Sequence, residues 1–314
     1  MNILFDIAHP AHVHLLRNVY FKLVENGHNV YVTVKDIPSA IGLLNEFSIP
    51  YIYLGSKGDS LFSKAILQIM YNIKVWGLVV SKRIQIGFSS SLTLAHISKV
   101  TKMHSIILDD DDDAVEPLFV KWGHPFADVV LSPACVERAS SKLISYAGYH
   151  ELAYLHPTRF TPDVRVLEEI DLTEIDTFFI LRFNAFKAHH DVGVQGLSIE
   201  NKRKLIAYLE TKGKVFITTE RNIDDEFKKY QLLLSPEKIH SLMYYATMLV
   251  GDSQTMTSEA AVLGTPAIRC NSFVGRISVL EEEEHNYKLT FGFLPLQADE
   301  MFKKIEDLLA MPDL

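Results

Sequence analysis

Residues 251–269, with the sequence GDSQTMTSEAAVLGTPAIR, constrain the fold more strongly than any other stretch of the chain. An apolar run of strand length, residues 246–250, comes directly before it. The spacing then predicts a short helix that ends at a Gly-Thr-Pro turn and has one apolar face, formed by Met256, Ala260 and Leu263. A strand, a polar turn, a helix and a second strand make an α/β unit. Ligands of open α/β sheets bind at the carboxyl ends of the strands.

The turn before this helix is rich in groups that bind anions. Ser253, Gln254 and Thr255 bring side-chain hydroxyl and amide groups to a helix N-terminus, where backbone N–H groups are free. Glu259 follows Thr255 by one helical turn, so the two residues share a face. We expect its carboxylate to accept hydrogen bonds from a sugar. The alternative is that Ser253 and Thr255 only cap the helix and that Glu259 is a solvated surface acid.

The totals of the sequence limit the class of protein. A chain of 314 residues is long for a single core and suits two domains, which we place at residues 1–160 and 161–314. The net charge of −8 argues against a nucleic-acid partner. Two cysteines without metal-type spacing indicate a reducing compartment. The N-terminus enters a strand without a signal-like segment, so we expect a cytoplasmic protein.

Strand-like and helix-like segments alternate through both halves of the chain. The run at residues 2–8 is a buried strand, and it opens a β-α-β-α-β pattern that continues with strands at residues 30–34 and 51–54. This pattern is typical of doubly wound domains with parallel sheets, although no G-x-G-x-x-G fingerprint follows the first strand. Proline and glycine punctuation places the interdomain linker within residues 133–161.

The most apolar segment is residues 61–80. Its length suits a membrane span, but Lys64 and Lys74 interrupt it and Lys82 and Arg83 follow it. A buried or partly exposed helix is the first interpretation. The alternative is an interfacial helix that makes peripheral contact with a membrane.

Several groups in the first half could transfer protons. His9 and His12 lie in the loop after the first strand, and histidine titrates nearest to neutral pH. The aspartate run 109–113 follows another strand, and we expect Asp109 or Asp110 to point into a cleft while the others face water. Adjacent carboxylates in an extended loop diverge, so we expect no metal site there. Glu116 is a further acid just beyond the run.

The second half offers groups that suit a diphosphate. Arg182 follows a predicted strand, and a guanidinium group matches the geometry of phosphate oxygens. His189 and His190 come soon after it, and Glu220 follows the next strand at residues 214–218. No metal arrangement can be assembled from these spacings.

Residues 251–269 resemble the donor-binding segment of the GT-B nucleotide-sugar enzymes. The likeness is greatest to the hydrolysing UDP-N-acetylglucosamine 2-epimerases and the lipid-linked N-acetylglucosaminyltransferases. The chain as a whole resembles a largely archaeal and bacterial family of that superfamily that is defined by sequence and not by activity. The resemblance implies two Rossmann-like domains with a nucleotide-sugar cleft between them. It assigns donor binding to Arg182, His189, Glu220, Ser253, Gln254, Thr255 and Glu259.

The resemblance also implies the chemistry. We expect a metal-independent glycosyltransferase with a UDP-sugar donor and no further cofactor, in which His12 or Asp110, with His9 nearby, activates the acceptor. A hydrolysing 2-epimerase is the second hypothesis, supported by the acids Asp109, Asp110 and Glu116. A non-catalytic nucleotide-sugar-binding protein is the third. The acceptor (a glycan, a lipid or a small molecule) and the oligomeric state stay open.

Overall fold

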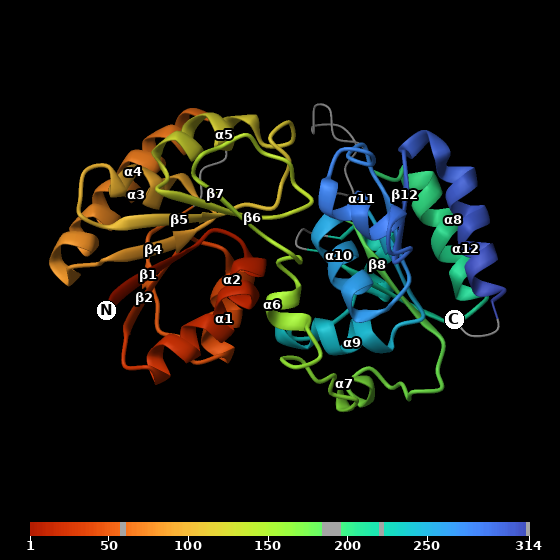
Figure 1. Cartoon of the computed structure of the whole chain (residues 1–314). Helices are drawn as coiled ribbons and strands as arrows, with labels where there is room; N and C mark the ends of the chain where they lie inside the picture. The colour runs from red at the N-terminus through yellow and green to blue at the C-terminus, as the bar shows by residue number, and fades with distance from the viewer. Residues whose placement is uncertain (57–60, 184–195, 220–222, 312–314) are drawn as a thin grey trace. The chain divides into compact units, whose positions relative to one another are not determined.

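The computed structural model describes residues 1–56, 61–183, 196–219 and 223–311, and for residues 61–65 the backbone alone. The chain divides into two compact units, unit 1 (Met1–Tyr154) and unit 2 (Leu155–Leu314), each with its own sheet (Figure 1). The division falls six residues before the boundary that we placed at residue 160.

Unit 1 contains a seven-stranded parallel sheet in the order β3-β2-β1-β4-β5-β6-β7. The strands are β1 (Asn2–Ile7), β2 (Asn29–Val34), β3 (Ile52–Tyr53), β4 (Ile86–Ser89), β5 (His104–Leu108), β6 (Val129–Pro133) and β7 (Leu143–Tyr146). The helices are α1 (Pro10–Glu25), α2 (Pro38–Glu46), α3 (Leu61–Lys82), α4 (Leu92–Ser98), α5 (Pro117–Trp122) and η1 (His124–Phe126), while α6 (Leu152–Leu155) spans the division. The strand order reverses between β1 and β4, which creates a switch point at their carboxyl ends.

The first strand shows how this sheet is packed. Because both faces of β1 are covered, its sequence is a nearly continuous apolar run. Phe5 packs in the cluster with α1 and α2, where Val13 and Leu16 lie on the buried face of α1. Leu4 points to the other face, into the cluster that contains α3 and α4.

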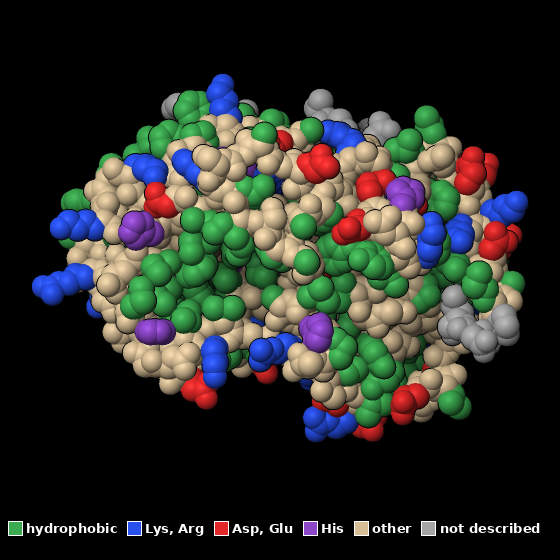
Figure 2. Space-filling model, viewed as in Figure 1, with side chains coloured by type: hydrophobic (Ala, Val, Ile, Leu, Met, Phe, Trp, Pro, Cys, Tyr) green, Lys and Arg blue, Asp and Glu red, His purple; other side chains and the backbone are tan. Residues whose placement is uncertain are grey.

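Helices cover the half of this sheet formed by β4, β5, β6 and β7 less completely. On the face that carries α1 and α2, Phe88 of β4, Ile106 of β5 and Leu131 of β6 are only partly buried. Ile144 of β7 is 54% exposed. Figure 2 shows hydrophobic side chains gathered over this part of unit 1. By contrast, Ile107 and Val130, which point to the opposite face, are fully buried.

The strand β7 shortens the predicted linker. The division between the units lies within residues 133–161, where we placed the linker, but Leu143–Tyr146 pair in parallel with β6 and close the edge of the unit 1 sheet. The strand has four residues, and the side chains of its middle pair are exposed. So short and open an edge strand carries little hydrophobic signal, which is why the sequence pattern missed it.

Unit 2 contains a five-stranded parallel sheet in the order β12-β11-β10-β8-β9. The strands are β8 (Phe178–Arg182), β9 (Lys214–Thr218), β10 (Met248–Gly251), β11 (Ala267–Cys270) and β12 (Thr290–Phe293). The helices are α7 (Arg165–Glu168), α8 (Ile199–Glu210), η2 (Asp225–Tyr230), η3 (Pro236–Lys238), α9 (Ile239–Tyr245), α10 (Gln254–Leu263), α11 (Ser278–His285), η4 (Pro295–Gln297) and α12 (Ala298–Leu309). The switch point of this sheet lies between β8 and β10.

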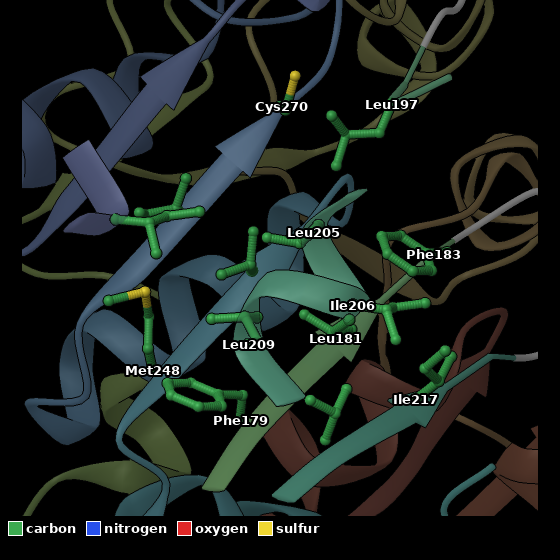
Figure 3. Packing of buried hydrophobic residues seen from close by; sticks show 14 of the residues in the cluster. Phe179, Leu181, Phe183, Leu197, Leu205, Ile206, Leu209, Ile217, Met248 and Cys270 are labelled. Atoms are coloured by element: carbon green, nitrogen blue, oxygen red, sulfur yellow. The ribbon is translucent and has the colours of Figure 1, made fainter. Parts of the chain in front are cut away.

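The central strand β8 is buried on both faces. Phe179 and Leu181 pack against α8 and α12, through residues such as Leu205 (Figure 3). The alternating residues Phe178 and Ile180 pack on the other face, in the cluster that contains α9 and α10. This two-sided burial explains the unbroken apolar run of the strand and fixes the position of its carboxyl end.

Candidate active site

The carboxyl ends of β8 and β10 meet at the switch point of unit 2. Gly251, the last residue of β10, pairs in register with Arg182, the last residue of β8. A Cβ atom at Gly251 would lie 2.1 Å from the backbone oxygen of Arg182. Position 251 therefore requires glycine, because any side chain would push the two strands apart.

The helix α10 starts directly beyond this point, as the sequence predicts. Ser253 caps it, since its Oγ accepts a hydrogen bond from the backbone N–H of Met256 at 3.4 Å. Gln254 and Thr255 form the first turn and are partly exposed. Gly264 ends the helix with a φ of 86°, a left-handed conformation that favours glycine. The positive end of the helix dipole thus lies at the carboxyl edge of the sheet.

Two buried cations accompany this helix N-terminus. The Nη1 atom of Arg182 donates a hydrogen bond to Thr218 Oγ1 at the end of β9, at 3.3 Å. Lys202 of α8 is also buried, with its Nζ atom 4.8 Å from the ring centroid of Phe183. Burial lowers the pKa of Lys202, while the charges of Asp252 and Asp224 oppose that shift. Lys202 was not among the residues expected at this site.

Glu259 is not a solvated surface acid. Its side chain is buried, and its Oε1 lies 2.9 Å from Nε2 of the equally buried His240 in α9. The surface alternative is therefore wrong, and the role of Glu259 in donor binding stays a prediction. Two other predicted donor contacts, His189 and Glu220, lie outside the described residues.

In unit 1, His9 and His12 begin the helix that follows β1. His9 is the exposed N-cap residue of α1, and its Nδ1 accepts a hydrogen bond from the N–H of Ala11 at 3.3 Å. His12 lies within the first turn, and its Nδ1 accepts from the N–H of Ala8 at 3.3 Å. The centroids of the His9 and His12 rings are 6.0 Å apart.

The environment of His12 differs from the expected one. Burial lowers its pKa to about 3, helped by the nearby His9 and His150, while the charge of Asp110 opposes the shift. We expected a pKa close to the ordinary value of histidine. His12 is instead neutral throughout the physiological range, which makes it a weak proton acceptor.

His150 forms an ion pair with Asp110. The Nδ1 atom of His150 lies 3.0 Å from Asp110 Oδ2, while its buried Nε2 has no hydrogen-bond partner among the described residues. Burial is the largest single effect and would lower the pKa of His150, but the charge and hydrogen bond of Asp110, with the charges of Glu151 and Asp109, together outweigh it and raise the pKa. The pKa of Asp110 is lowered, because His150 outweighs the opposing effect of burial. Tyr146 stacks on the His150 ring with centroids 6.2 Å apart.

Asp109 has a structural role that the sequence did not reveal. Its Oδ2 lies 2.7 Å from His124 Nε2 and also pairs with Nη1 of Arg138, whose Nη2 donates to the backbone oxygen of Asp111. The pKa of Asp109 is lowered because these hydrogen bonds outweigh burial. Asp109 therefore anchors the aspartate loop, and Asp110 is the residue free to pair with His150.

Two other acids of this region, Asp111 and Glu116, are protonated more easily than usual. Burial, together with the charges of Asp110 and Glu116, raises the pKa of Asp111 to about 7. The pKa of Glu116 is also raised, by burial and by Asp109 and Asp110, although its side chain reaches solvent just before α5. Among the described residues, no group of three or more His, Cys, Asp or Glu side chains could hold a metal ion.

His150 was missed because its partner lies forty positions earlier in the chain. The turn that carries it contains Gly148 with a φ of 143°, a conformation that side chains rarely adopt. This turn follows β7, whose short and exposed sequence does not reveal a strand either. The only local signal was the Gly-Tyr-His sequence within residues 133–161, and that signal does not indicate which residue His150 pairs with.

Known proteins resemble this chain in sequence or in fold. An uncharacterized protein of Methanocaldococcus jannaschii is 20% identical over 286 residues, covering 86% of this chain and 82% of the relative. A solved UDP-GlcNAc 2-epimerase of the same organism, in complex with UDP-GlcNAc and UDP, has a TM-score of 0.71 at 10% identity, covering 99% of this chain and 93% of that one. A glycosyltransferase from Rickettsia africae has a TM-score of 0.56 at 13% identity, covering 98% and 88%.

These likenesses confirm the predicted fold, two Rossmann-like α/β domains of the GT-B type. Residues 1–279 also match the family described as protein of unknown function DUF354. That match covers most of the 314 residues, so the chain belongs to the DUF354 family.

Proposed function

We propose that the protein is a nucleoside-diphosphate-sugar enzyme, with a UDP-sugar as donor, that breaks the bond between the anomeric carbon and the diphosphate. The solved relative in complex with UDP-GlcNAc supports this class of donor. Unit 2 binds the donor and unit 1 transfers the proton. Glycosyl transfer to an acceptor hydroxyl is the reaction proposed first.

The groups of unit 2 suit a leaving diphosphate. As the anomeric bond breaks, the electron pair passes to the phosphate oxygen and negative charge grows there. The N-terminus of α10 offers free backbone N–H groups at the end of β10, and Arg182 supplies a fixed positive charge at the end of the neighbouring strand β8. These groups are held before substrate arrives, so little reorganisation is needed.

The Asp110–His150 pair is the observation that carries the proposal for unit 1. Asp110 occupies Nδ1 of His150 and leaves Nε2 free to take the proton of the acceptor hydroxyl as its oxygen bonds to the anomeric carbon. The carboxylate also stabilises the imidazolium that forms. His12 was the first candidate for this role, but its low pKa and its Nδ1 contact with Ala8 favour His150 instead.

A hydrolysing 2-epimerase is the second candidate. Inversion at C2 requires a proton to leave and return at that carbon, so more than one proton-transfer group is needed. Asp111 supports this reading, since a pKa of about 7 lets it exist in both protonation states near neutral pH. The raised pKa of the neighbouring Glu116 adds a second such acid.

One experiment separates these candidates. The protein is incubated with UDP-GlcNAc and other UDP-sugars in deuterated water, with and without EDTA and with and without a pool of acceptors, and the products are followed by NMR. Acceptor-dependent release of UDP without deuterium at C2 supports glycosyl transfer. Acceptor-independent release of a 2-epimer carrying deuterium at C2 supports the epimerase. If a UDP-sugar binds but is not converted, the protein is a non-catalytic nucleotide-sugar-binding protein. If none of the UDP-sugars binds, the proposal is wrong.

A further inference from the structure

One long helix of unit 1 carries an exposed apolar stripe. Six residues of α3 are between 45% and 62% exposed, although all are large hydrophobic side chains: Ile66, Ile69, Met70, Ile73, Trp76 and Val80. They recur at helical spacing and form a single face. The opposite face packs into unit 1 through Tyr71, Val75 and Val79. The stripe therefore lies on a helix that is well packed on its other face, and it is not a result of poor packing.

The charged residues of α3 itself have one sign. The 22 residues of α3 include no Asp or Glu, whereas the whole chain has a net charge of −8. Lys82 and Arg83 are exposed at its carboxyl end, directly before β4. Because such a helix end already carries a partial negative charge, these cations are favourably placed there.

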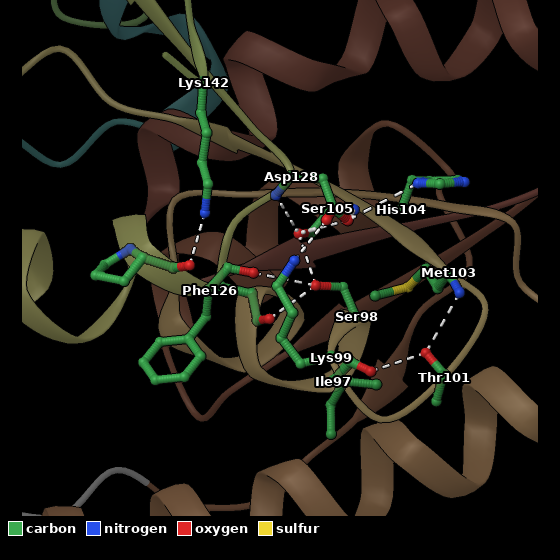
Figure 4. Close-up of polar contacts among 12 residues, drawn as sticks. Ile97, Ser98, Lys99, Thr101, Met103, His104, Ser105, Phe126, Asp128 and Lys142 are labelled. Carbon is green, nitrogen blue, oxygen red and sulfur yellow. Dashed lines mark hydrogen bonds and ion pairs between the residues drawn. The ribbon is translucent and has the colours of Figure 1, made fainter. Parts of the chain in front are cut away.

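A second basic turn lies at the same edge of the sheet. The helix α4 leads into β5, which pairs with β4, so the turn after α4 is next to the end of α3. This turn exposes Val100, at 67%, between Lys99 and Lys102. Asp128 neutralises Lys99 through a contact of 2.6 Å (Figure 4), which leaves Lys102 with Lys82 and Arg83 as exposed cations.

We propose that α3 docks on the surface of an anionic lipid bilayer, with its stripe among the acyl chains and its basic end at the headgroups. Apolar residues with a tryptophan on one face, together with basic residues and no acids, are the features of interfacial helices. No helix among the described residues is long and apolar enough to cross a bilayer, so the contact is peripheral. Docking onto the α3 helix of a second copy of the chain is less favourable. It would bring two basic helix ends together, and neither helix has an acidic residue to balance them.

The two tryptophans of the chain allow a direct test. Trp122→Phe leaves Trp76, inside the stripe, as the only tryptophan, whose emission is followed by selective excitation. This protein is mixed with vesicles of phosphatidylglycerol and phosphatidylcholine, and with vesicles of phosphatidylcholine alone. We expect the emission to shift to the blue and to become protected from acrylamide with the anionic vesicles, and brominated acyl chains to quench it. An unchanged spectrum with the anionic vesicles would overturn the proposal.

Charge substitutions locate the contact. In the Trp122→Phe background, Ile73→Glu should reduce partitioning into anionic vesicles at least tenfold, because a carboxylate replaces an inserted side chain. The control, Ile175→Glu, changes a side chain that is 94% exposed in unit 2 and should leave partitioning unchanged. Equal losses in the two variants contradict a contact through α3.

The lipid headgroups and a second copy are distinguished in two further ways. Lys82→Ala and Arg83→Ala should each weaken binding to anionic vesicles about fivefold at low salt, since each basic residue near such a surface contributes about 1 kcal/mol. Light scattering measures the mass of the unmodified protein and of the Ile73→Glu variant without vesicles. A dimer that Ile73→Glu converts into a monomer would assign the stripe to a second copy and overturn the lipid proposal.

Discussion

Unit 1 and unit 2 have the same kind of parallel sheet but present different chemistry at its carboxyl edge. In unit 1 the groups there titrate: His12, Asp110, Asp111 and His150 all have pKa values displaced by burial and by one another. In unit 2 the edge carries the N-terminus of α10 and the buried guanidinium group of Arg182, which suit an anionic ligand. One edge is suited to moving protons, and the other to holding an anion.

This contrast teaches that the fold alone does not determine the chemistry of a strand end. A doubly wound sheet supplies a switch point in each unit, but the residues placed there decide whether charge is fixed or exchangeable. Changes in unit 2 should therefore alter donor affinity, and changes in unit 1 should alter the rate. The following predictions test that separation.

The largest effect is expected at the switch point of unit 2. Gly251→Ala would place a Cβ atom 2.1 Å from the Arg182 backbone oxygen, so β8 and β10 would have to separate. Overpacking of this kind costs about 3 kcal/mol or more, which corresponds to a fall in Tm of roughly 6–12 °C, and nucleotide binding should be lost. Calorimetric unfolding and nucleotide titration measure both. Gly42→Ala in α2, where a Cβ atom has no neighbour within 4 Å, is the control and should be neutral or slightly stabilising.

The second prediction concerns the proton-transfer group of unit 1. His150→Gln should lower kcat by about 10²–10⁴ while donor affinity stays the same, because a base acts mainly in the transition state. His104→Gln changes an exposed histidine at the amino end of β5 and serves as the control. A variant that loses donor affinity and keeps its kcat would contradict the division between the units.

The pH profile of the same reaction identifies the base. Asp110 raises the pKa of His150 above its ordinary value of 6.5, and only neutral His150 accepts a proton. The rate of the unmodified enzyme should therefore rise with pH through an apparent pKa above 6.5. If His12 were the base, with a pKa of about 3, the rate would already be constant at about pH 5 and above.

The third prediction sharpens the contrast, because unit 2 also contains a titrating group. Glu283 is fully buried, accepts a hydrogen bond from Ser258 at 2.6 Å, and burial raises its pKa from 4.5 to about 7. The folded state then holds a proton that the unfolded state has lost, so this group destabilises the fold progressively as pH rises from about 4.5 to about 7. Below about pH 4.5 the Glu283 carboxyl group does not change the free energy of unfolding. Above about pH 7 it lowers that free energy by the full amount.

Glu283→Gln removes this titration and keeps an oxygen for Ser258. Relative to the unmodified protein, its free energy of unfolding should improve by up to about 3 kcal/mol between pH 4 and pH 8, since each pKa unit corresponds to about 1.4 kcal/mol. Denaturant titrations across that range measure the difference. The pH dependence of kcat should not change. If it does, Glu283 takes part in the reaction and unit 2 is not limited to binding.

The smallest effect is expected at the cap of α10. Ser253→Ala removes the acceptor for the Met256 N–H and should cost about 1 kcal/mol of stability, with a modest loss of donor affinity. Ser235→Ala is a matched control, because Ser235 precedes η3 without making a side-chain cap hydrogen bond. Similar nucleotide affinities for both variants would mean that the donor does not use the cap of α10.

The local parts of the fold could be predicted from the sequence. The helix at residues 254–263 and its end at Gly264 follow from apolar spacing and from the conformational freedom of glycine. The opening strands of unit 1 follow from their apolar runs in the same way. These features depend on residues within one or two helical turns of each other, so a single sequence contains the necessary information.

The parts that depend on distant residues could not be predicted. The pairing of Asp110 with His150 requires β7, a short edge strand with little hydrophobic signal. The anchoring of Asp109 by Arg138 and the burial of Glu259 against His240 depend on which helices and loops pack together. Spacing along the chain does not carry that information, and so the candidate site was predicted less completely than the fold.

The uneven cover of the unit 1 sheet affects how the folded protein behaves in solution. Phe88, Ile106 and Leu131 are partly accessible over one half of a sheet face, and Ile144 is more than half exposed at its edge. Dyes that fluoresce in apolar surroundings bind such surfaces in the native state as well as in partly unfolded states. The native protein should therefore give a high dye signal before any unfolding occurs. A bright signal at low temperature is expected of the correctly folded chain and is not a sign of misfolding.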